Sequence, residues 1–212
     1  MRYNYPMPVR RDFDQDYYQR FYGDSAARRT YQREEARLGD FVCSYLKYMQ
    51  QPVRRVVDIG CGFGQWRAII SRHFPRAQYV GVEYSEHLCA RYGWLHGSAV
   101  DFSADHPFDL VICKDTLQYL SAREFRDAAA NLASICSGAL FASILTSEDW
   151  EQNCDRRRTD KHVHLRSGDW YRRVLGRYFT NLGGGLFLSE SSPAIAWELE
   201  SLPSRGQSMR AS

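Results

Sequence analysis

The run VVDIGCGFG at residues 56–64 constrains the fold of this chain more than any other feature. Its first residues are β-branched or apolar, as in a strand that is buried on both faces of a sheet. Gly60, Gly62 and Gly64 then permit a tight turn and leave bare backbone against which a ligand can lie. A helical pattern follows, so amide groups at the start of that helix would face the ligand. The run therefore predicts a strand, a ligand-binding turn and a helix.

Strand and helix patterns alternate after this turn. Apolar residues between Trp66 and Phe74 recur at three- and four-residue spacing and stop at Pro75, which predicts an amphipathic helix. Further strands are expected at residues 79–82, 95–100, 108–113 and 140–145. This alternation favours parallel pairing with right-handed crossovers, hence a doubly wound α/β sheet with helices on both faces.

Helix-capping residues support this assignment. Ser85 is the expected N-cap of the helix that follows the second strand. Ser121 and Glu124 have the spacing of a capping box, which predicts a helix that runs to about Cys136. The chain therefore marks the starts of its helices as well as their apolar faces.

The C-terminal region continues with one helix and two strand-like runs. The helix is expected after Ser167 and extends to Leu175. The strand-like runs are residues 178–189 and 194–201, and the glycines at 183–185 are expected to form a bulge in the first of them.

The spacing of the glycines distinguishes two classes of nucleotide site. Nicotinamide and flavin enzymes favour G-x-G-x-x-G after their first strand, whereas this chain has G-x-G-x-G. Asp58 also precedes the first glycine. Its carboxylate would repel a diphosphate and attract a cationic amino-acid group. The turn therefore favours a positively charged ligand over a dinucleotide.

Acidic residues follow the next two strands. Glu83 ends the second strand, where a carboxylate can accept hydrogen bonds from both hydroxyls of a ribose. Asp101 and Phe102 follow the third strand and would supply a carboxylate for the adenine amino group and an aromatic face for its ring. Open α/β sheets bind ligands at the carboxyl ends of their strands, so these residues would line one crevice with Asp58. An adenosine attached to a positive group fits this pattern best.

With these residues, the chain resembles the class I S-adenosylmethionine-dependent methyltransferase family over residues 53–145. The run at 56–64 is similar to the family's first motif, and FDLVICKDTLQYL at 108–120 is similar to its fourth. The resemblance implies a Rossmann-like sheet of seven mostly parallel strands with a C-terminal antiparallel hairpin, here within residues 178–201. It also implies S-adenosylmethionine as the cofactor and S-adenosylhomocysteine as the product.

The resemblance assigns cofactor contacts to residues at the strand ends. It implies contacts from Asp58, Gly60, Cys61 and Gly62 on the methionine and ribose side, from Glu83 at the ribose, and from Tyr84, Asp101 and Phe102 around the adenine. Lys114 and Asp115, at the end of the fourth-motif strand, would border the reacting methyl group.

A helical arm is expected before the ligand-binding domain. Apolar residues recur at helical spacing between Asp12 and Gln50 and give the arm one apolar face. In the family such an arm commonly closes the cofactor pocket, so the resemblance implies a hydroxyl contact to the methionine carboxylate from Tyr17, Tyr18 or Tyr22. The expected division is residues 1–52 for the arm, 53–202 for the methyltransferase domain and 203–212 for a tail.

Methyl transfer is an in-line displacement at a sulfonium methyl, and alignment in a dry pocket can supply most of the catalysis. A hydroxyl or protonated amine as acceptor also needs a base with a pKa near neutrality. His162 and His164 follow the fifth strand and, in an extended segment, would face the same way. Asp115 is a second candidate. For both histidines a surface or hydrogen-bonding role is the competing interpretation.

Composition narrows the class of protein. Hydrophobic residues make up 44% and charged residues 25% of the chain, as in an ordinary globular domain. The apolar stretch at residues 139–145 is far shorter than the roughly 20 residues of a membrane helix. Pro6 and Pro8 interrupt an N-terminal stretch that is unlike a signal peptide.

Six cysteines without C-x-x-C spacing favour reduced thiols, and no zinc pattern is recognised. We therefore expect a soluble cytoplasmic protein without a metal.

The choice of acceptor is constrained mainly by missing patterns. The net charge is only +3, and basic residues such as Arg156–Arg158 are scattered among acids, which disfavours nucleic acid as a partner. The strand end has Cys-Lys-Asp-Thr rather than the Asn-Pro-Pro-aromatic pattern of enzymes that methylate exocyclic amines of bases. A small-molecule acceptor is favoured, while protein and RNA acceptors stay open. The sequence does not determine the oligomeric state.

Two alternatives to a methyltransferase are kept. A nicotinamide-dependent oxidoreductase would share the strand, turn and helix but not the glycine spacing. A non-catalytic protein that binds S-adenosylmethionine or a partner surface would share the whole pattern.

Overall fold

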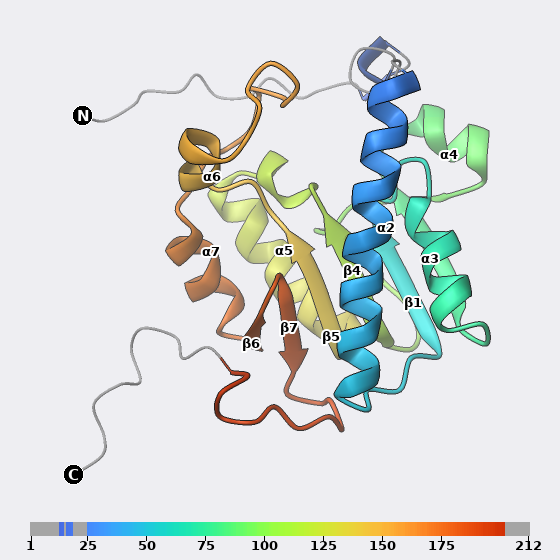
Figure 1. The fold of residues 1–212 in the computed structure, drawn as a ribbon, viewed down its shortest axis with the longest axis vertical. Coiled ribbons are helices and arrows are strands. Elements are labelled where there is room, and N and C mark those ends of the chain that lie inside the picture. Colours follow the sequence, from blue (N-terminus) through green and yellow to red (C-terminus); the bar gives the residue numbers. More distant parts are fainter. Residues whose placement is uncertain (1–12, 15, 19–24, 202–212) are drawn as a thin grey trace.

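The computed structural model describes residues 13–14, 16–18 and 25–201, in which helices and strands alternate along the chain (Figure 1). The helices are α2 (Ser25–Tyr48), α3 (Gln65–His73), α4 (Glu86–Tyr92), α5 (Ala122–Ile135), α6 (Ser147–Gln152), α7 (Gly168–Leu175) and the 3-10 helix η1 (Leu117–Tyr119). The strands are β1 (Arg55–Ile59), β2 (Gln78–Glu83), β3 (Leu95–His96), β4 (Phe108–Lys114), β5 (Cys136–Ser143), β6 (Phe179–Gly183) and β7 (Leu186–Ser189).

These strands form one sheet in the order β3-β2-β1-β4-β5-β7-β6. The first five strands pair in parallel with their neighbours, and β7 lies antiparallel to both β5 and β6. The chain builds the sheet outward from β1 to β3 and then returns to place β4 on the other side of β1. Such a switch point opens a crevice at the carboxyl ends of the central strands. The expected mostly parallel sheet with an antiparallel hairpin is confirmed.

The terminal hairpin lies earlier than expected. Both of its strands fall within residues 178–189. Gly183 ends β6, where the register with β7 shifts as in the expected bulge, and Gly184 and Gly185 form the turn between the strands. Gly183, Gly184 and Gly185 have φ angles of 81°, 58° and 79°, which glycine adopts without strain and which reverse the chain. Residues 194–201 contain no strand, so the expectation of a second strand there was wrong.

Two other strand boundaries also differ. β3 covers only two of the expected residues 95–100, because a turn follows in which Ser98 N and Oγ both donate to the Asp101 carboxylate at 2.8 Å. β5 begins four residues earlier than expected, directly at the end of α5. Gly138 makes this early pairing possible, since a Cβ there would lie 2.1 Å from the carbonyl oxygen of Asp109.

The expected helix caps are confirmed. The side chains of Ser85 and Ser167 accept hydrogen bonds from backbone amides in the first turns of α4 and α7. Ser121 and Glu124 form the complete capping box at the start of α5. Each cap satisfies amides that the helix itself leaves unpaired.

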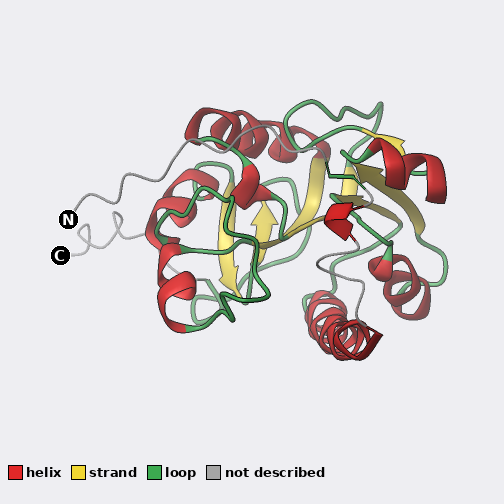
Figure 2. Cartoon of the chain, turned by 90° about the horizontal axis from the view of Figure 1, so that it is seen from above, coloured by secondary structure: helices red, strands yellow, loops and turns green. Residues whose placement is uncertain are grey.

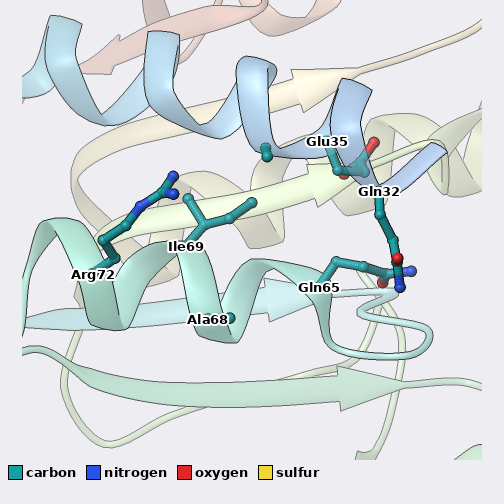
Figure 3. A pocket seen from close by; sticks show the side chains of 7 residues that line it. Gln32, Glu35, Gln65, Ala68, Ile69 and Arg72 are labelled. Carbon is teal, nitrogen blue, oxygen red and sulfur yellow. The ribbon is translucent and has the colours of Figure 1, made fainter. Parts of the chain in front are cut away.

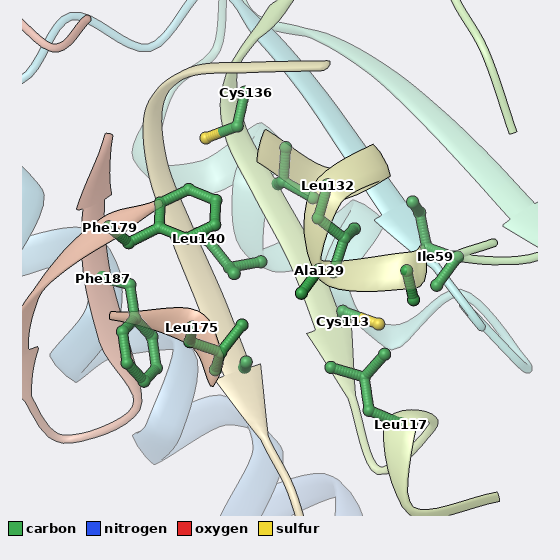
Figure 4. Packing of buried hydrophobic residues seen from close by; sticks show 14 of the residues in the cluster. Ile59, Cys113, Leu117, Ala129, Leu132, Cys136, Leu140, Leu175, Phe179 and Phe187 are labelled. Atoms are coloured by element: carbon green, nitrogen blue, oxygen red, sulfur yellow. The ribbon is translucent and has the colours of Figure 1, made fainter. Parts of the chain in front are cut away.

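The sheet separates two hydrophobic clusters, because successive strand residues point to opposite faces (Figure 2). On one face α5 and α7 cover the sheet, with Leu132, Leu140, Leu175 and Phe187 among the packed side chains (Figure 4). On the other face α2 and α3 cover it. α2 is therefore one of the packing layers of the sheet, through an apolar stripe that includes Val42, Cys43, Leu46 and Met49.

Among the described residues, no helix combines the length and the apolarity that crossing a bilayer would require.

Candidate functional site

The glycine turn between β1 and α3 is held in one conformation. Gly60, Gly62 and Gly64 have φ angles of 76°, 54° and 74°, which residues with side chains rarely adopt. The amides of Gly60 and Cys61 donate to the carbonyl oxygen of Val82 at 2.8 and 3.1 Å. A Cβ at Gly62 would meet no described atom within 4 Å. The turn therefore presents open backbone at Gly62 on a fixed frame.

Trp94 supports the turn from below and was missed by the sequence analysis. Its Nε1–H donates to the carbonyl oxygen of Gly62 at 3.0 Å. Its ring occupies the space of two absent side chains, because a Cβ at Gly64 or at Gly81 would lie 2.5 Å from a ring atom. The two glycines are therefore required by the close approach of the indole, which no local pattern indicates.

Glu83 ends β2, as predicted, and is buried. One carboxylate oxygen accepts from the amide of Gly62 at 2.8 Å, and the other accepts from the amides of Tyr84 and Ser85 at 2.9 and 3.0 Å. A buried carboxylate needs such donors to offset the loss of water. Glu83 thus joins the glycine turn to the end of β2, a structural role additional to the predicted ribose contact.

Asp58 is buried in the sheet beneath the turn. The hydroxyl of Tyr79 donates to its carboxylate at 2.6 Å. Burial raises the pKa of Asp58 to about 7, although the hydrogen bond from Tyr79 opposes this change. Its neighbours Glu35 and Glu83 raise the pKa further, so this carboxyl group is poised to change charge near neutral pH.

Lys114 lies at the carboxyl end of β4 in a buried ion pair. Its ammonium contacts Glu35 of α2 at 2.8 Å and also contacts Asp115, and it lies over the ring of Tyr31. The second oxygen of Glu35 accepts from Trp66 Nε1 at 3.1 Å. Burial raises the pKa of Glu35 and Lys114 opposes that change. Asp115, Tyr31 and Glu35 together outweigh burial and hold the pKa of Lys114 above its usual range.

Asp115 has a φ angle of 53°, which is unusual for a residue with a side chain. Its amide donates to the carbonyl oxygen of Ser143 at 2.8 Å, and Ser143 Oγ donates to its carboxylate at 3.2 Å. Thr116 fills the space beside Gly60, where a Cβ would lie 2.1 Å from the threonine hydroxyl oxygen. The ends of β1, β4 and β5 are therefore joined at Asp115 and Thr116.

Asp101 and Phe102 lie beyond β3, as predicted. The Asp101 carboxylate already accepts the two hydrogen bonds from Ser98 N and Oγ. The centroid of the Phe102 ring lies 6.3 Å from that of the Phe108 ring. The backbone carbonyl oxygen of Phe102 accepts a hydrogen bond from the side chain of Asn131 in α5 at 2.8 Å. The structure places both residues near the edge of the sheet, and their contact with adenine stays a prediction.

An N-terminal segment, residues 13–18 without residue 15, lies across this edge. Ser85 Oγ donates to the carbonyl oxygen of Phe13 at 2.5 Å. The Phe13 ring contacts Tyr84 at a centroid distance of 6.2 Å and Tyr119 at 5.2 Å. Tyr17 and Tyr119 share a hydrogen bond of 2.9 Å between their hydroxyls. The segment thus bridges the ends of β2 and β4. Tyr22 lies outside the described residues.

The second tyrosine of this segment, Tyr18, packs against the glycine turn. Its ring lies 5.3 Å from that of Phe63, which in turn lies 6.1 Å from the ring of Tyr92. The N-terminal segment therefore contacts the loops that follow β1, β2 and β4.

His162 and His164 belong to the loop between α6 and α7 and have different environments. The His162 side chain is 62% exposed, and its Nδ1 lies 3.3 Å from the carboxylate of Asp160. His164 is anchored through its backbone, because its amide donates to Gln118 O at 2.8 Å. Burial, together with Arg166, lowers the pKa of His164, although Glu124 opposes this change.

A groove of about 420 Å³ lies between α2 and α3, beside the ion pair of Lys114 (Figure 3). Gln32 and Glu35 border it from α2, and Gln65, Ile69 and Arg72 border it from α3. It lies outside the strand-end crevice, although it shares Glu35 with it. Among the described residues no cluster of histidine, cysteine and acidic side chains could hold a metal ion.

Comparison with known proteins agrees with this geometry. A family model described as a methyltransferase domain matches residues 57–137. A second model, for protein-L-isoaspartate(D-aspartate) O-methyltransferase, matches residues 8–93. No curated protein matches the chain significantly in sequence.

Solved structures of similar fold include three bacterial proteins. An O-methyltransferase family protein from Burkholderia thailandensis is 19% identical with a TM-score of 0.57, over 85% of this chain and 64% of that one. This chain therefore spans less than two thirds of that protein. A second structure is magnesium protoporphyrin IX methyltransferase from Synechocystis with bound S-adenosylmethionine. It is 19% identical with a TM-score of 0.58, over 81% of this chain and 84% of that one. DesVI of Streptomyces venezuelae is 16% identical with a TM-score of 0.55, over 73% of this chain and 90% of that one.

Proposed function

This chain belongs to the class I S-adenosylmethionine-dependent methyltransferase family, and on that premise we propose that it transfers a methyl group from S-adenosylmethionine to a small-molecule acceptor. The transfer is an in-line displacement at the sulfonium methyl. S-adenosylmethionine is a co-substrate in this reaction, because its methyl group leaves and S-adenosylhomocysteine remains.

One observation carries the proposal: the glycine turn presents open backbone at Gly62 together with two buried acids at the carboxyl edge of the sheet. No described atom occupies the space beside the Cα of Gly62. Asp58 in β1 and Glu83 at the end of β2 are buried, and Glu83 accepts a hydrogen bond from the Gly62 amide. Close approach of a ligand to bare backbone, next to carboxylates that attract a cation, suits an adenosine that carries a positive amino acid.

The charges around the crevice agree with such a ligand. Four acids border its central part, namely Glu35, Asp58, Glu83 and Asp115. A single lysine, Lys114, is shared between two of them. This excess of negative charge would repel the diphosphate of a nicotinamide cofactor and attract a sulfonium. The electrostatics and the family together argue against the oxidoreductase alternative.

A small-molecule acceptor is supported by the substrates that the names of similar structures give. Magnesium protoporphyrin IX methyltransferase is one such structure. The plantazolicin methyltransferase BpumL, 17% identical with a TM-score of 0.54, is another, in complex with a pentazolic analogue and S-adenosylhomocysteine. Acceptors as different as these show that the fold does not set the acceptor. We further propose a cytoplasmic enzyme, because all six cysteines lie within the described residues and are free thiols.

Calorimetric titration with S-adenosylmethionine, S-adenosylhomocysteine and NAD tests the proposal. We expect binding of the first two at micromolar concentration and no heat from NAD. Binding of NAD alone would overturn the methyltransferase assignment. Binding of S-adenosylmethionine without turnover on any acceptor would identify a non-catalytic member of the family.

The ribose assignment is tested separately with Glu83→Ala. We expect cofactor affinity to fall by roughly 1–3 kcal/mol, because the ribose hydroxyls and the amide of Gly62 both lose an acceptor. His164→Ala is the matched control and should bind the cofactor as the wild type does. An unchanged affinity in Glu83→Ala would remove Glu83 from the ribose site.

A further inference from the structure

Building on the proposed function, we propose that His162 is the general base of the reaction, that Asp160 is its positioning residue, and that the acceptor nucleophile is an oxygen or nitrogen that carries a proton. Asp160 is buried, with 7% of its surface exposed, whereas the imidazole beside it is largely exposed. A buried carboxylate that orients an accessible imidazole is the arrangement by which histidine acts as a base in other enzymes.

The geometry fixes the tautomer of His162. One oxygen of Asp160 accepts from the backbone amide of His162 at 3.0 Å and lies 3.3 Å from Nδ1 of the same residue. An ionised carboxylate only accepts hydrogen bonds, so Nδ1 carries the hydrogen. The lone pair is then on Nε2, on the side of the ring away from Asp160. That nitrogen is available to accept a proton from a bound acceptor.

Two contacts fasten the loop that carries His162 to the strand-end crevice. The hydroxyl of Tyr119 in η1 donates to the second oxygen of Asp160 at 3.4 Å. The amide of His164 donates to the carbonyl oxygen of Gln118, also in η1, at 2.8 Å. His162 lies between these two anchors. Because η1 begins two residues after Asp115, these two contacts hold the loop that carries His162 beside the segment that follows β4.

The same contacts reach the N-terminal segment. Tyr119 shares its hydroxyl hydrogen bond with Tyr17, and its ring packs against Phe13, whose carbonyl oxygen is bound by Ser85 after β2. Among the described residues, the charged and titratable groups connected to the imidazole include Asp160 and Lys161 from its own loop, Tyr119 from η1 and, beyond it, Tyr17. The ring contacts of Phe13 with Tyr84 and Tyr119 connect this region to the residue that follows β2.

A buried acceptor atom supports an acceptor that carries a proton. Gln118 donates its side-chain amide to the carbonyl oxygen of Asp115 at 2.9 Å. Its Oε1 is buried and has no hydrogen-bond partner among the described residues. Buried polar atoms are normally paired, so this oxygen is an unused acceptor for an N–H or O–H group beside Asp115.

The proton and charge balance of the step is complete. The nucleophile forms its bond to the methyl carbon while the S–CH₃ bond breaks and its electron pair goes to sulfur. The proton of the nucleophile passes to Nε2 of His162, and the imidazolium then donates through Nδ1 to Asp160. Positive charge thus leaves the sulfonium and appears on an imidazole that a carboxylate already stabilises. The exposed ring afterwards releases its proton to water.

His164 does not fit this role. Its carbonyl oxygen accepts from the hydroxyl of Tyr171 at 3.1 Å and from Arg166 at 3.4 Å, and its amide is bound to η1. These contacts use its backbone to hold the loop. His164 is therefore a backbone anchor of the loop that carries His162.

The test measures the imidazole pKa of His162 by NMR in the free protein and in complexes with S-adenosylmethionine and S-adenosylhomocysteine, with His162→Gln to assign the resonance. The two ligands differ by one positive charge. A unit charge about 10 Å away, at an effective dielectric constant of about 40, shifts a pKa by roughly half a unit. We expect the His162 pKa to be lower by at least that amount with S-adenosylmethionine than with S-adenosylhomocysteine.

Asp160→Asn tests the positioning role in the same experiment. In asparagine, Oδ1 can still accept from the amide of His162 and Nδ2 can donate to the hydroxyl oxygen of Tyr119, so the loop stays anchored while the charge beside Nδ1 is removed. We expect the His162 pKa to fall by about one unit and to be restored in Asp160→Glu. An unchanged pKa in Asp160→Asn would overturn the pair.

The outcomes separate this inference from the proposed function. If both ligands bind but give His162 the same pKa, the base is not beside the sulfonium and the inference is wrong, while the methyltransferase assignment survives. If neither ligand binds, the proposed function is wrong and the inference falls with it.

Discussion

Asp58 shows how one residue can connect the stability of the fold to the binding of its ligand. The carboxyl group is held within the sheet, with only the hydroxyl of Tyr79 as a side-chain partner among the described residues. Its folded-state pKa of about 7 is above the ordinary value of 3.8. Below pH 7 the protonated form is therefore favoured in the free protein, and a cationic ligand would favour the ionised form.

Stability is expected to fall as the pH rises towards 7. Between pH 4 and 7 the folded state holds a proton on Asp58 that the unfolded state releases, so this group's contribution is present at low pH and lost as pH rises through the folded pKa. The slope is at most roughly 1.4 kcal/mol per pH unit. Urea unfolding at pH 5, 6, 7 and 8 measures it. Asp58→Asn should show a flatter profile, and equal slopes in both proteins would contradict the shift.

At the scale of elements, a buried ion pair joins α2 to the end of β4. Glu35 and Lys114 are 79 positions apart in the chain, yet their side chains are only 5% and 12% exposed where they meet. α2 also contributes Tyr31 beside the ammonium. The helix is thereby fastened at the crevice end by charge and along its length by the apolar stripe that packs on the sheet.

Breaking this pair should destabilise the protein strongly. Lys114→Met leaves the buried Glu35 without its cation, and we expect it to lower the free energy of unfolding by about 3–5 kcal/mol. Glu35→Gln should cost less, because Asp115 still pairs with Lys114. The double variant should lose less than the sum, because neither charge is then left unpaired. Chemical denaturation of the four proteins measures the coupling. Additive losses would show that the two side chains do not stabilise each other.

At the scale of the whole molecule, the crevice collects loops from both halves of the sheet. Residues 13–18 without residue 15, the glycine turn, the end of β2 and η1 are in contact there. A ligand bound among them would be held by elements that are far apart in the chain. Ligand binding should therefore stabilise the protein against global unfolding as well as against local opening.

Thermal unfolding should report this effect. With S-adenosylhomocysteine at about 100 times its dissociation constant, the free energy of unfolding rises by about 2.7 kcal/mol. For a domain of this size that corresponds to roughly 5–11 °C in Tm. NAD at the same concentration is the control and should leave Tm unchanged. An equal shift with NAD would contradict the specificity of the crevice.

The sequence by itself determined the order of strands and helices, the helix caps and the acids at the strand ends. These features depend on residues that are neighbours in the chain, such as the run at 56–64 and the Ser121–Glu124 box, so local periodicity and spacing encode them. The hairpin was misplaced because three glycines permit either a bulge or a reversal, and only their pairing with the sheet decides between these.

Tertiary structure decided which distant side chains meet. Glu35 with Lys114, Trp94 with the glycine turn, and Tyr119 with both Tyr17 and Asp160 are combinations that no spacing in the sequence indicates. Each partner is chosen by the packing of helices and loops against the sheet, because burial and distance set the strength of a charge or a hydrogen bond. The fold of this chain is therefore encoded in local patterns, whereas the chemistry proposed for its site depends on contacts made only after folding.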